Sequence, residues 1–354
     1  MEGIDKLNNN NVCKIITHTN KKNIRILIIT DIHQKSSKID KIRQYCYKYK
    51  INYDYIFCMG DFDSLFIKEQ KNEILINESI EIIKNILQLL ETLCKRIFFI
   101  PGNHDPKIFF TKNTPQLTLY SKNIHKKIIE IEDNLLLIGI GGCIPNFFSE
   151  NEKNFHTFNF DLNNISKKNI QYKGFPYCNN FEDVNYIKSD EMYLNDIKDI
   201  FEEIKKSKNK NKQIILLSHS GPIWSDTSNS FNQGKVKYCG SQNLQNIINM
   251  NYNKILLNIH GHTHKSIGLM SLFNTKIVNP GSLRKGKFGE IIIRKNENIN
   301  QWEVKSIQLK NINLILKIHI INENENNNIK VNDFSSCSEE DDDVENEIEN
   351  SLRK

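Results

Sequence analysis

The sequence is poor in the two residues that most often interrupt helices and strands. Only 15 of its 354 residues are glycine and 7 are proline, whereas isoleucine, asparagine and lysine are frequent. We attribute this bias to the nucleotide composition of a genome rather than to chemistry. At this length the chain can form one large domain or two small ones, in either case with a buried core.

Long apolar segments are also missing. No stretch reaches the roughly 20 apolar residues that a membrane span requires, and residues 1–20 lack the continuous apolar segment of a signal peptide. We therefore expect no membrane association. The sequence predicts a cytoplasmic protein, with the nucleus as the alternative.

The eight cysteines form no CxxC pair and follow no spacing typical of a disulfide framework. Cys58, for example, lies in an apolar run, so reduced and buried thiols in an intracellular protein are the favoured interpretation. A concentrated basic stripe is missing too, because the net charge of +6 comes from lysines dispersed along the chain. Such lysines indicate a solvated surface, so we expect no nucleic-acid partner. Nothing in the sequence identifies a protein partner.

What the sequence does contain is a set of short apolar runs that predict buried β-strands. Five of them are followed at once by residues that can bind metal ions. The runs are 24–29, 55–59, 97–100, 214–217 and 255–259, and the residues that follow are Asp31 and His33; Asp61; Asn103, His104 and Asp105; His219; and His262 and His264. Because strand carboxyl ends converge on one crevice in α/β architectures, we expect these five loops to meet.

The last of these loops contains three histidines at alternate positions, His260, His262 and His264. Alternate residues of a strand point to one face, so a strand that continued through this segment would direct three imidazoles to one point. Gly261, between the first two, would allow other backbone to approach closely.

The remaining elements follow from the same patterns. Helical spacing predicts helices over 38–50, 65–95, 189–207 and 241–250, the third with Ser189 as its N-cap. Further strands are expected at 127–131, 135–140, 266–272, 276–278, 288–294, 302–308 and 312–320. We expect one domain over 23–321 with a candidate insertion or substrate lid at 145–188, a flexible leader over 1–22 and a disordered acidic tail over 322–354.

The mixture of donors in the five loops indicates a chemistry. Asp, Asn and His without thiolates suit Mn, Fe or Zn. The donors are too many for one tetrahedral centre and suit two divalent ions, which a carboxylate can bridge. Two ions about 3.5–4 Å apart can clamp a phosphoryl group during an in-line displacement and lower the pKa of a shared water to make hydroxide.

Together the five loops resemble the motifs of the calcineurin-like metallophosphoesterases, over residues 24–294. That family includes Ser/Thr phosphatases, purple acid phosphatases, cyclic-nucleotide phosphodiesterases and repair nucleases. The resemblance implies an α/β fold in which a two-sheet β-sandwich is flanked by helices. It also implies ligands of a first metal (Asp31, His33, Asp61 and His264), with Asp61 as the bridge, and ligands of a second (Asn103, His219 and His262). His104 matches the catalytic histidine, which would protonate the leaving oxygen or hold the phosphoryl group in the transition state.

From His219 onward the sequence is similar to the smaller bacterial and archaeal-type branch of the family, which is phosphodiesterase-like. The shared segments are 218–222, 240–241, 261–264 and 278–282. The last contains a Pro-Gly turn in which Asn279 either shapes the site or belongs to a plain hairpin turn. His260 has no ligand role in the family, so we expect it to pack beside the ligands.

The sequence departs from the phosphoprotein phosphatases of the family, which read Gly-Asp-x-x-Asp-Arg-Gly. Position 64 is Ser rather than the second Asp, which orients the catalytic histidine, and neither Arg nor Gly follows. Asp63 or Asp105 could take over the orienting role. A small phosphoester is therefore favoured over a phosphoprotein as the substrate.

The sequence thus predicts a dinuclear metal-dependent phosphoesterase that hydrolyses a phosphodiester or a small phosphomonoester by attack of a metal-activated hydroxide. One alternative is a non-catalytic scaffold of the same fold, like one retromer subunit, but the presence of His104 with a full ligand set argues against it. Others are a phosphoprotein phosphatase and a nuclease acting on DNA ends.

Phe175, Tyr177 and Phe181 in the 145–188 segment could stack on a base, with an ordinary surface loop as the alternative.

Overall fold

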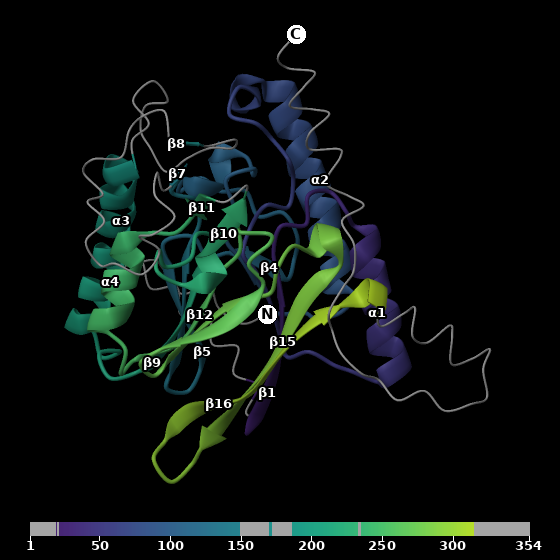
Figure 1. The fold of residues 1–354 in the computed structure, drawn as a ribbon. Coiled ribbons are helices and arrows are strands. Elements are labelled where there is room, and N and C mark those ends of the chain that lie inside the picture. The colour runs from purple at the N-terminus through teal and green to yellow at the C-terminus, as the bar shows by residue number, and fades with distance from the viewer. Residues whose placement is uncertain (1–18, 20, 149–169, 172–185, 233–234, 315–354) are drawn as a thin grey trace. The chain divides into compact units, whose positions relative to one another are not determined.

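The computed structural model describes residues 19, 21–148, 170–171, 186–232 and 235–314, all of which lie in one unit, Met1–Leu316. Within this unit, two six-stranded mixed sheets are flanked by helices (Figure 1). The predicted α/β fold with two sheets and flanking helices is confirmed.

In the first sheet, four parallel strands are completed by two antiparallel strands from later in the chain. The strand order is β16 (Gln301–Asn311), β15 (Lys287–Asn296), β1 (Asn23–Ile29), β2 (Tyr55–Cys58), β3 (Ile97–Phe99) and β4 (Ser121–Asn123). Helices α1 (Ser37–Tyr49) and α2 (Glu73–Glu91) pack on one face of this sheet through a buried apolar cluster.

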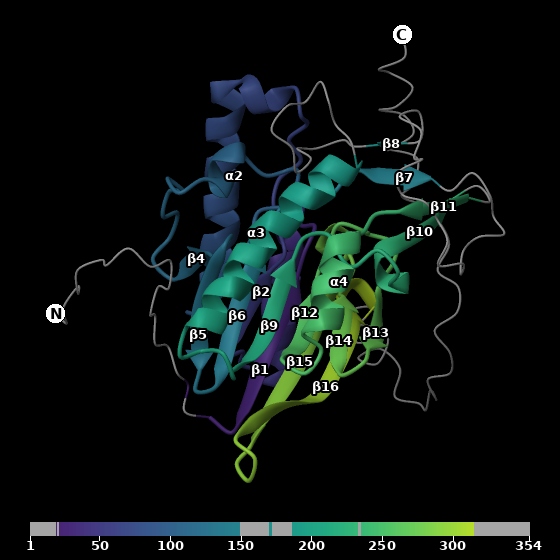
Figure 2. The same cartoon turned by 90° about the vertical axis from the view of Figure 1, so that its left-hand side faces the viewer.

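The second sheet has parallel strands at its centre and an antiparallel strand at each edge. Its order is β13 (Gly268–Leu272), β14 (Thr275–Asn279), β12 (Ile255–Ile259), β9 (Gln213–Ser218), β6 (Leu135–Ile140) and β5 (Lys127–Glu132). Helices α3 (Tyr186–Lys206) and α4 (Gln242–Met250) cover its outer face, as Figure 2 shows.

The inner faces of the two sheets share an apolar core, because alternate residues of a strand point to opposite faces. In β1, Ile26 and Ile28 belong to the core between the sheets, whereas Leu27 and Ile29 belong to the cluster under α1 and α2. All four side chains are fully buried, each contributing roughly 1.5–3 kcal/mol. Burial on both faces explains why this strand is an unbroken apolar run in the sequence.

A third, smaller sheet has the order β10 (Asn229–Asn232), β11 (Lys235–Tyr238), β7 (Asn146–Phe148) and β8 (Ile170–Gln171). Short 3-10 helices also occur between the main elements: η1 (Glu69–Lys71), η2 (Lys107–Phe110), η7 (Asp226–Ser228) and η8 (Leu283–Lys285). The small sheet had no counterpart in the sequence predictions.

Two predicted helix starts are wrong. The helix predicted from residue 65 begins at Glu73, because Asn72 is extended and its side chain accepts hydrogen bonds from the N–H groups of Ile74 and Leu75. Helix α3 begins at Tyr186, which packs into the apolar cluster below it, so Ser189 is a buried residue inside the helix and not its N-cap.

The two strands predicted at 302–308 and 312–320 are also wrong in part. A single strand, β16, runs to Asn311 because it pairs along the whole of β15. Residues 312–314 then form a helical turn, and residues 315–320 lie outside the described ranges.

Several predictions fall on residues that the structure does not describe. These are most of the leader 1–22, most of the 145–188 segment with its three aromatic residues, and the tail 322–354. The single domain over 23–321 stays a prediction. Among the described residues, no helix combines the length and the apolar character needed to cross a bilayer.

Candidate metal centre and active site

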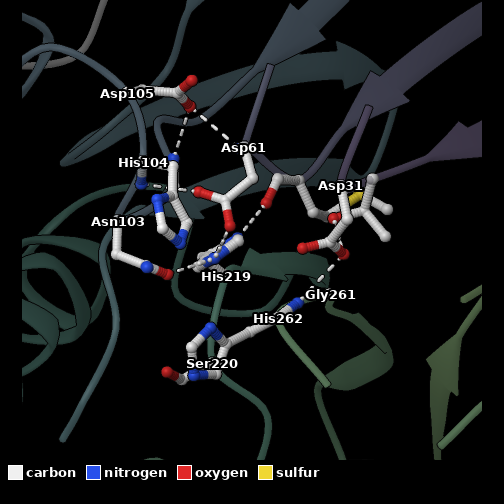
Figure 3. A network of polar contacts seen from close by, with 12 residues as sticks. Asp31, Asp61, Asn103, His104, Asp105, His219, Ser220, Gly261 and His262 are labelled. Carbon is white, nitrogen blue, oxygen red and sulfur yellow. Dashed lines mark hydrogen bonds and ion pairs between the residues drawn. The ribbon is translucent and has the colours of Figure 1, made fainter. Parts of the chain in front are cut away.

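The candidate site lies where strands of both large sheets end. Strands β1, β2 and β3 lead to Asp31, Asp61 and Asn103, while β9 and β12 of the other sheet lead to His219 and His262. Figure 3 shows these side chains directed toward one another. The five loops meet, as the position of their strands in an α/β fold requires.

Four of the predicted ligands have a left-handed backbone, which is rare for residues with a Cβ atom. The angle φ is 53° at Asp31, 46° at His33, 54° at Asp61 and 65° at His262. Hydrogen bonds fix these turns: the N–H of Asp31 donates to the carbonyl of Gly60, and that of His33 to the carbonyl of Asp61. Strain of this kind costs about 1–3 kcal/mol per residue and clusters at functional sites.

Two glycines allow the second and third loops to touch. A Cβ atom on Gly60 would lie 2.2 Å from the backbone nitrogen of Gly102, and one on Gly102 would lie 2.1 Å from Oδ1 of Asp61. A side chain on Gly102 would therefore displace the Asp61 carboxylate, and one on Gly60 would push apart the backbones of the two loops. This is the physical reason for glycine directly before Asp61 and Asn103.

One donor atom each from Asp31, His33, Asp61 and His264 lies within 4.8 Å of the others, so these residues form a first group of potential ligands. Nε2 of His264 is 3.1 Å from Oδ1 of Asp31 and 3.2 Å from Nε2 of His33. Nδ1 of His33 donates to the backbone carbonyl of Asp63 at 3.0 Å. Since the proton is on Nδ1, Nε2 of His33 presents a lone pair to the group.

A second group of potential ligands consists of Asp61, His219 and His262. Nε2 of His219 is 3.3 Å from Oδ2 of Asp61 and 3.0 Å from Oδ1 of Asn103. Nδ1 of His219 donates to the carbonyl of Met59 at 2.5 Å. Asp61 belongs to both groups, which is the place that a bridging carboxylate would occupy.

The carboxylates and imidazoles of the centre shift one another's pKa values. Burial would raise the pKa of Asp61, but His219 and His104 hold it well below its usual range. Burial would lower the pKa of His219, but the charge of Asp61 outweighs it and raises this pKa to about 9. Burial would also raise the pKa of Asp31, but His264 lowers it to about 2. Two buried, ionised carboxylates attract positive charge, either protons on imidazoles or metal ions.

The donor set fits divalent metal ions. Nε2 of His219 faces the amide oxygen of Asn103, and its proton is already on Nδ1, so with the amide in this orientation a second proton or a cation would satisfy the contact. Burial lowers the pKa of His33 to about 4, so its ring is neutral at physiological pH, which is the form that binds metal. We conclude that the residues of both groups can hold one ion each.

His104 lies beside the centre but belongs to neither group of ligands. Its backbone N–H donates to Oδ1 of Asp61 at 2.8 Å, and its Nδ1 donates to the carbonyl of Leu65 at 2.9 Å. The ring of Phe66 meets that of His104 edge-on at 6.0 Å. Nε2 is therefore the nitrogen that His104 can offer to a substrate.

The group that holds the ring of His104 is the Leu65 carbonyl, and not the carboxylate of Asp63 or Asp105, which the sequence offered as candidates. The Asp63 carboxylate accepts a hydrogen bond from the Gln34 side chain instead. The loop after β2 brings the backbone oxygen of Leu65 to Nδ1 of His104. Because every residue has a backbone carbonyl, this partner could not be identified from the sequence.

Asp105 organises the backbone around the centre. It is fully buried and accepts hydrogen bonds from the N–H groups of Asp61, Phe62, Asp63 and Gly102. Burial and the charge of Asp61 raise the pKa of Asp105 to about 8, although the N–H groups of Gly102 and Asp63 oppose this shift. Asp105 thus holds together the two loops that carry Asp61 and Asn103.

The three histidines of this loop do not share one strand face, because the strand does not continue through them. Strand β12 ends at Ile259, and the left-handed conformation of His262 turns the chain. His260 is fully buried, with Nε2 2.7 Å from the hydroxyl of Thr227. His262 and His264 fall into different ligand groups.

Gly261 makes room for side chains rather than for other backbone. A Cβ atom there would lie 1.9 Å from Oγ1 of Thr30 and 2.8 Å from Oδ2 of Asp31. The Thr30 hydroxyl and the N–H of His262 both donate to Oδ2 of Asp31, at 2.8 and 3.1 Å. These bonds leave Oδ1 of Asp31 for the first group of ligands.

Asn279 braces the loop that carries His262 and His264. It is fully buried, and its Nδ2 donates to the carbonyls of Thr227 and Thr263 at 3.0 and 2.9 Å. Its Oδ1 accepts from the N–H of Gly281 at 2.9 Å. Of the two interpretations of this turn, the structure favours a role in shaping the site.

Sequence reasoning missed Asn146, the first residue of β7. Its Oδ1 is 3.0 Å from Nε2 of His262, at the edge of the second ligand group. Asn146 lies in the segment that showed no periodicity, and an isolated asparagine there carries no signal that could have identified it.

Two sandwiched sheets with Asp and His clustered at their strand ends define a metallophosphoesterase fold. Residues 24–266 match the family model described as calcineurin-like phosphoesterase. This match covers more than half of the chain, so the chain belongs to the calcineurin-like phosphoesterase family. A search of curated proteins found no match.

Solved structures with a similar fold cover most of the chain. One crystal structure is 17% identical with a TM-score of 0.54, covering 82% of this chain and 99% of its own. TT1561 of Thermus thermophilus is 13% identical with a TM-score of 0.48 and the same coverage, 82% and 99%. A dimetal phosphatase from Danio rerio is 10% identical with a TM-score of 0.44, again covering 82% and 99%. At these identities the likeness concerns the fold alone.

Proposed function

We propose that the protein is a dinuclear metal-dependent hydrolase of a phosphodiester or a small phosphomonoester. The observation that carries this proposal is the position of Asp61, which is buried, belongs to both ligand groups and accepts a hydrogen bond from His104. A carboxylate shared by two groups of donors, next to a histidine that is not a ligand, suits two-metal catalysis of phosphoryl transfer.

The ligands are assigned as the sequence predicted them. Asp31, His33, Asp61 and His264 would hold one ion, and Asp61, Asn103, His219 and His262 the other. Bound there, two divalent ions supply Lewis-acid stabilisation of the phosphoryl oxygens and a water of lowered pKa. Mn, Fe and Zn all suit these oxygen and nitrogen donors.

His104 would act at the leaving oxygen. Because the Leu65 carbonyl fixes the proton on Nδ1, the proton that moves is the one on Nε2, and the imidazolium form is the donor. The hydrogen bond from its backbone to Asp61 ties the position of His104 to that carboxylate. General acids of this kind contribute typically about 10²–10⁴-fold to the rate.

A small phosphoester remains the proposed substrate. Where the phosphoprotein phosphatases have their second Asp, this chain has Ser64, whose hydroxyl lies 3.1 Å from Nδ1 of His33. A phosphoprotein phosphatase is therefore less favoured, and a nuclease is less favoured because the lysines are dispersed along the chain. Cys46, Cys58, Cys94 and Cys239 are buried free thiols, which supports a reducing compartment, the cytoplasm or the nucleus.

Metal analysis combined with a substrate panel tests the proposal. The purified protein is expected to bind two divalent ions per chain. Supplied with Mn²⁺, it should hydrolyse bis-p-nitrophenyl phosphate, p-nitrophenyl phosphate or a cyclic nucleotide, and a chelator should abolish this activity reversibly. Two bound ions without hydrolysis of any ester would favour the scaffold instead. Cleavage of single-stranded DNA alone would favour the nuclease.

A further inference from the structure

We propose that Asn146 is a positioning residue that fixes His262 for the second metal ion. This inference rests on the proposed two-metal function, and it adds a residue that none of the five loops contains. Oδ1 of Asn146 is 3.0 Å from Nε2 of His262, although the two residues are 116 positions apart in the sequence.

The contact decides which nitrogen of His262 faces the ligands. An amide oxygen only accepts hydrogen bonds, so Nε2 of His262 must carry the proton and Nδ1 keeps a lone pair. Figure 3 shows a ring nitrogen of His262 on the side that faces His219. If the amide of Asn146 were turned round, its NH₂ group would force the proton onto Nδ1 and remove that lone pair. The orientation of one amide therefore selects the tautomer that can bind metal.

Strand β7 keeps this amide in place. The next residue, Phe147, is fully buried, stacks on Tyr238 with ring centroids 5.0 Å apart, and meets Tyr186 edge-on, also at 5.0 Å. Because neighbouring residues of a strand point to opposite faces, these contacts direct Asn146 to the other face, toward His262. Asn146 is itself only 9% exposed.

Two other imidazoles of the centre are held differently. Nδ1 of His33 donates to the carbonyl of Asp63, and Nδ1 of His219 to that of Met59. Both carbonyls are backbone groups that no substitution can remove, and the Ser64 hydroxyl adds a second contact to His33. The partner of His262 is a side chain, so its contribution can be measured directly. Loss of a partner of this type typically lowers metal affinity about 10–100-fold.

The test is Mn²⁺ binding by isothermal titration calorimetry to the full chain and to three variants. Asn146→Ala is expected to bind the first ion as the unchanged protein does and the second about 10–100-fold more weakly. Asn146→Asp should recover the second ion, because a carboxylate accepts the same proton. The matched control is Asn123→Ala: Asn123 is 8% exposed and bonds Phe109 and His125, outside both ligand groups. It should bind two ions normally.

Three results would overturn the role of Asn146: an unchanged second affinity in Asn146→Ala, no recovery in Asn146→Asp, or an equal loss in Asn123→Ala. If Asn146→Ala does not fold, Asn146→Asp decides alone, and weaker binding of the second ion than in the unchanged protein would refute the proposal. If the unchanged protein binds fewer than two ions, the proposed function fails together with this inference. That outcome is distinct from a failure of Asn146 alone, in which the unchanged protein still binds both.

Discussion

At the scale of single residues, Asp61 meets several geometric demands at once. Its backbone is left-handed, its N–H donates to Asp105, and its Oδ1 accepts from the backbone of His104. Its Oδ2 lies 3.3 Å from Nε2 of His219 and 4.0 Å from Nε2 of His33, so it reaches into both ligand groups. Hardly any other side chain could satisfy the same contacts.

Replacing Asp61 by Asn keeps the shape of the side chain but removes its charge and one acceptor oxygen. We expect Asp61→Asn to bind fewer than two tight ions per chain, measured by metal analysis after gel filtration. The control is Asp54→Asn, since Asp54 is also buried but pairs with Lys21 away from the centre. Two tightly bound ions in Asp61→Asn would refute the bridging role.

His104 should matter for turnover and not for metal binding, because it belongs to neither ligand group. We expect His104→Ala to keep both ions while kcat falls about 10²–10⁴-fold, as the loss of a general acid does. The loss should grow with the pKa of the leaving group, since a poor leaving group depends more on protonation. Equal losses for p-nitrophenyl and alkyl esters would show that His104 acts in another way.

The sequence allowed the two groups of potential ligands to be anticipated because their members follow apolar strands closely, as Asp31 follows β1 and His219 follows β9. It did not allow the partners of these residues to be predicted. The Leu65 carbonyl that holds His104 is a backbone group, and Asn146 lies in a strand, β7, that pairs with β11 and contacts His262 from far away in the sequence. Such contacts depend on tertiary structure and have no local pattern.

At the scale of elements, the patterns predicted the helices and strands well but not all of their ends. Strands β1 and β9 were predictable because burial on both faces makes them continuous apolar runs. The placement of Ser189 within α3 was not predictable, because it depends on the burial of this helix face against the sheet. Apolar spacing also placed the start of α2 before Asn72, where a capping side chain overrides it.

The cap of α2 should contribute measurably to stability. Asn72→Ala removes the acceptor for the N–H groups of Ile74 and Leu75, so the free energy of unfolding should fall by about 1 kcal/mol. Urea denaturation measures this, with an unchanged slope expected. Asn72→Asp serves as the control, because it keeps the acceptor and should be as stable as the unchanged protein. An equal loss in both variants would contradict the capping role.

At the scale of the whole molecule, the order of the strands could not be predicted. The sequence indicates that strand ends meet, but not that β15, from the end of the domain, pairs antiparallel with β1 at its start. This pairing places Ser282, just before β15, where its hydroxyl donates to the carbonyl of Asp31 at 2.8 Å. The backbone of Asp31 is thus fixed from the far end of the domain.

Stability should decrease in mild acid, partly because of His125. Burial, together with Lys126 and Lys127, lowers the pKa of His125 to about 3; its Nδ1 accepts from the N–H of Gly141. The unfolded chain, with a pKa near 6.5 for this group, therefore binds more protons between about pH 6.5 and pH 3. The contribution is fully present above pH 6.5 and is lost as the pH falls, by up to about 1.4 kcal/mol per pH unit.

The variant His125→Asn keeps the acceptor but does not titrate. Urea unfolding at pH 7 and pH 5 should show a smaller loss of stability in this variant than in the unchanged protein. The difference between the two proteins isolates His125 from the other groups that titrate in this range. Parallel losses would show that His125 is not neutral in the folded state.

The ligands of the first group come from both large sheets: Asp31 and Asp61 from loops of one, and His264 from a loop of the other. An ion held by all three would bind the folded chain and not the unfolded one. At a free concentration 100 times its Kd, such an ion adds about 2.7 kcal/mol to stability, so the melting temperature should rise with added Mn²⁺ and fall in a chelator. The lifetime of the protein in the cell would then follow the supply of metal, and scarcity of the ion would lower the amount of folded protein itself.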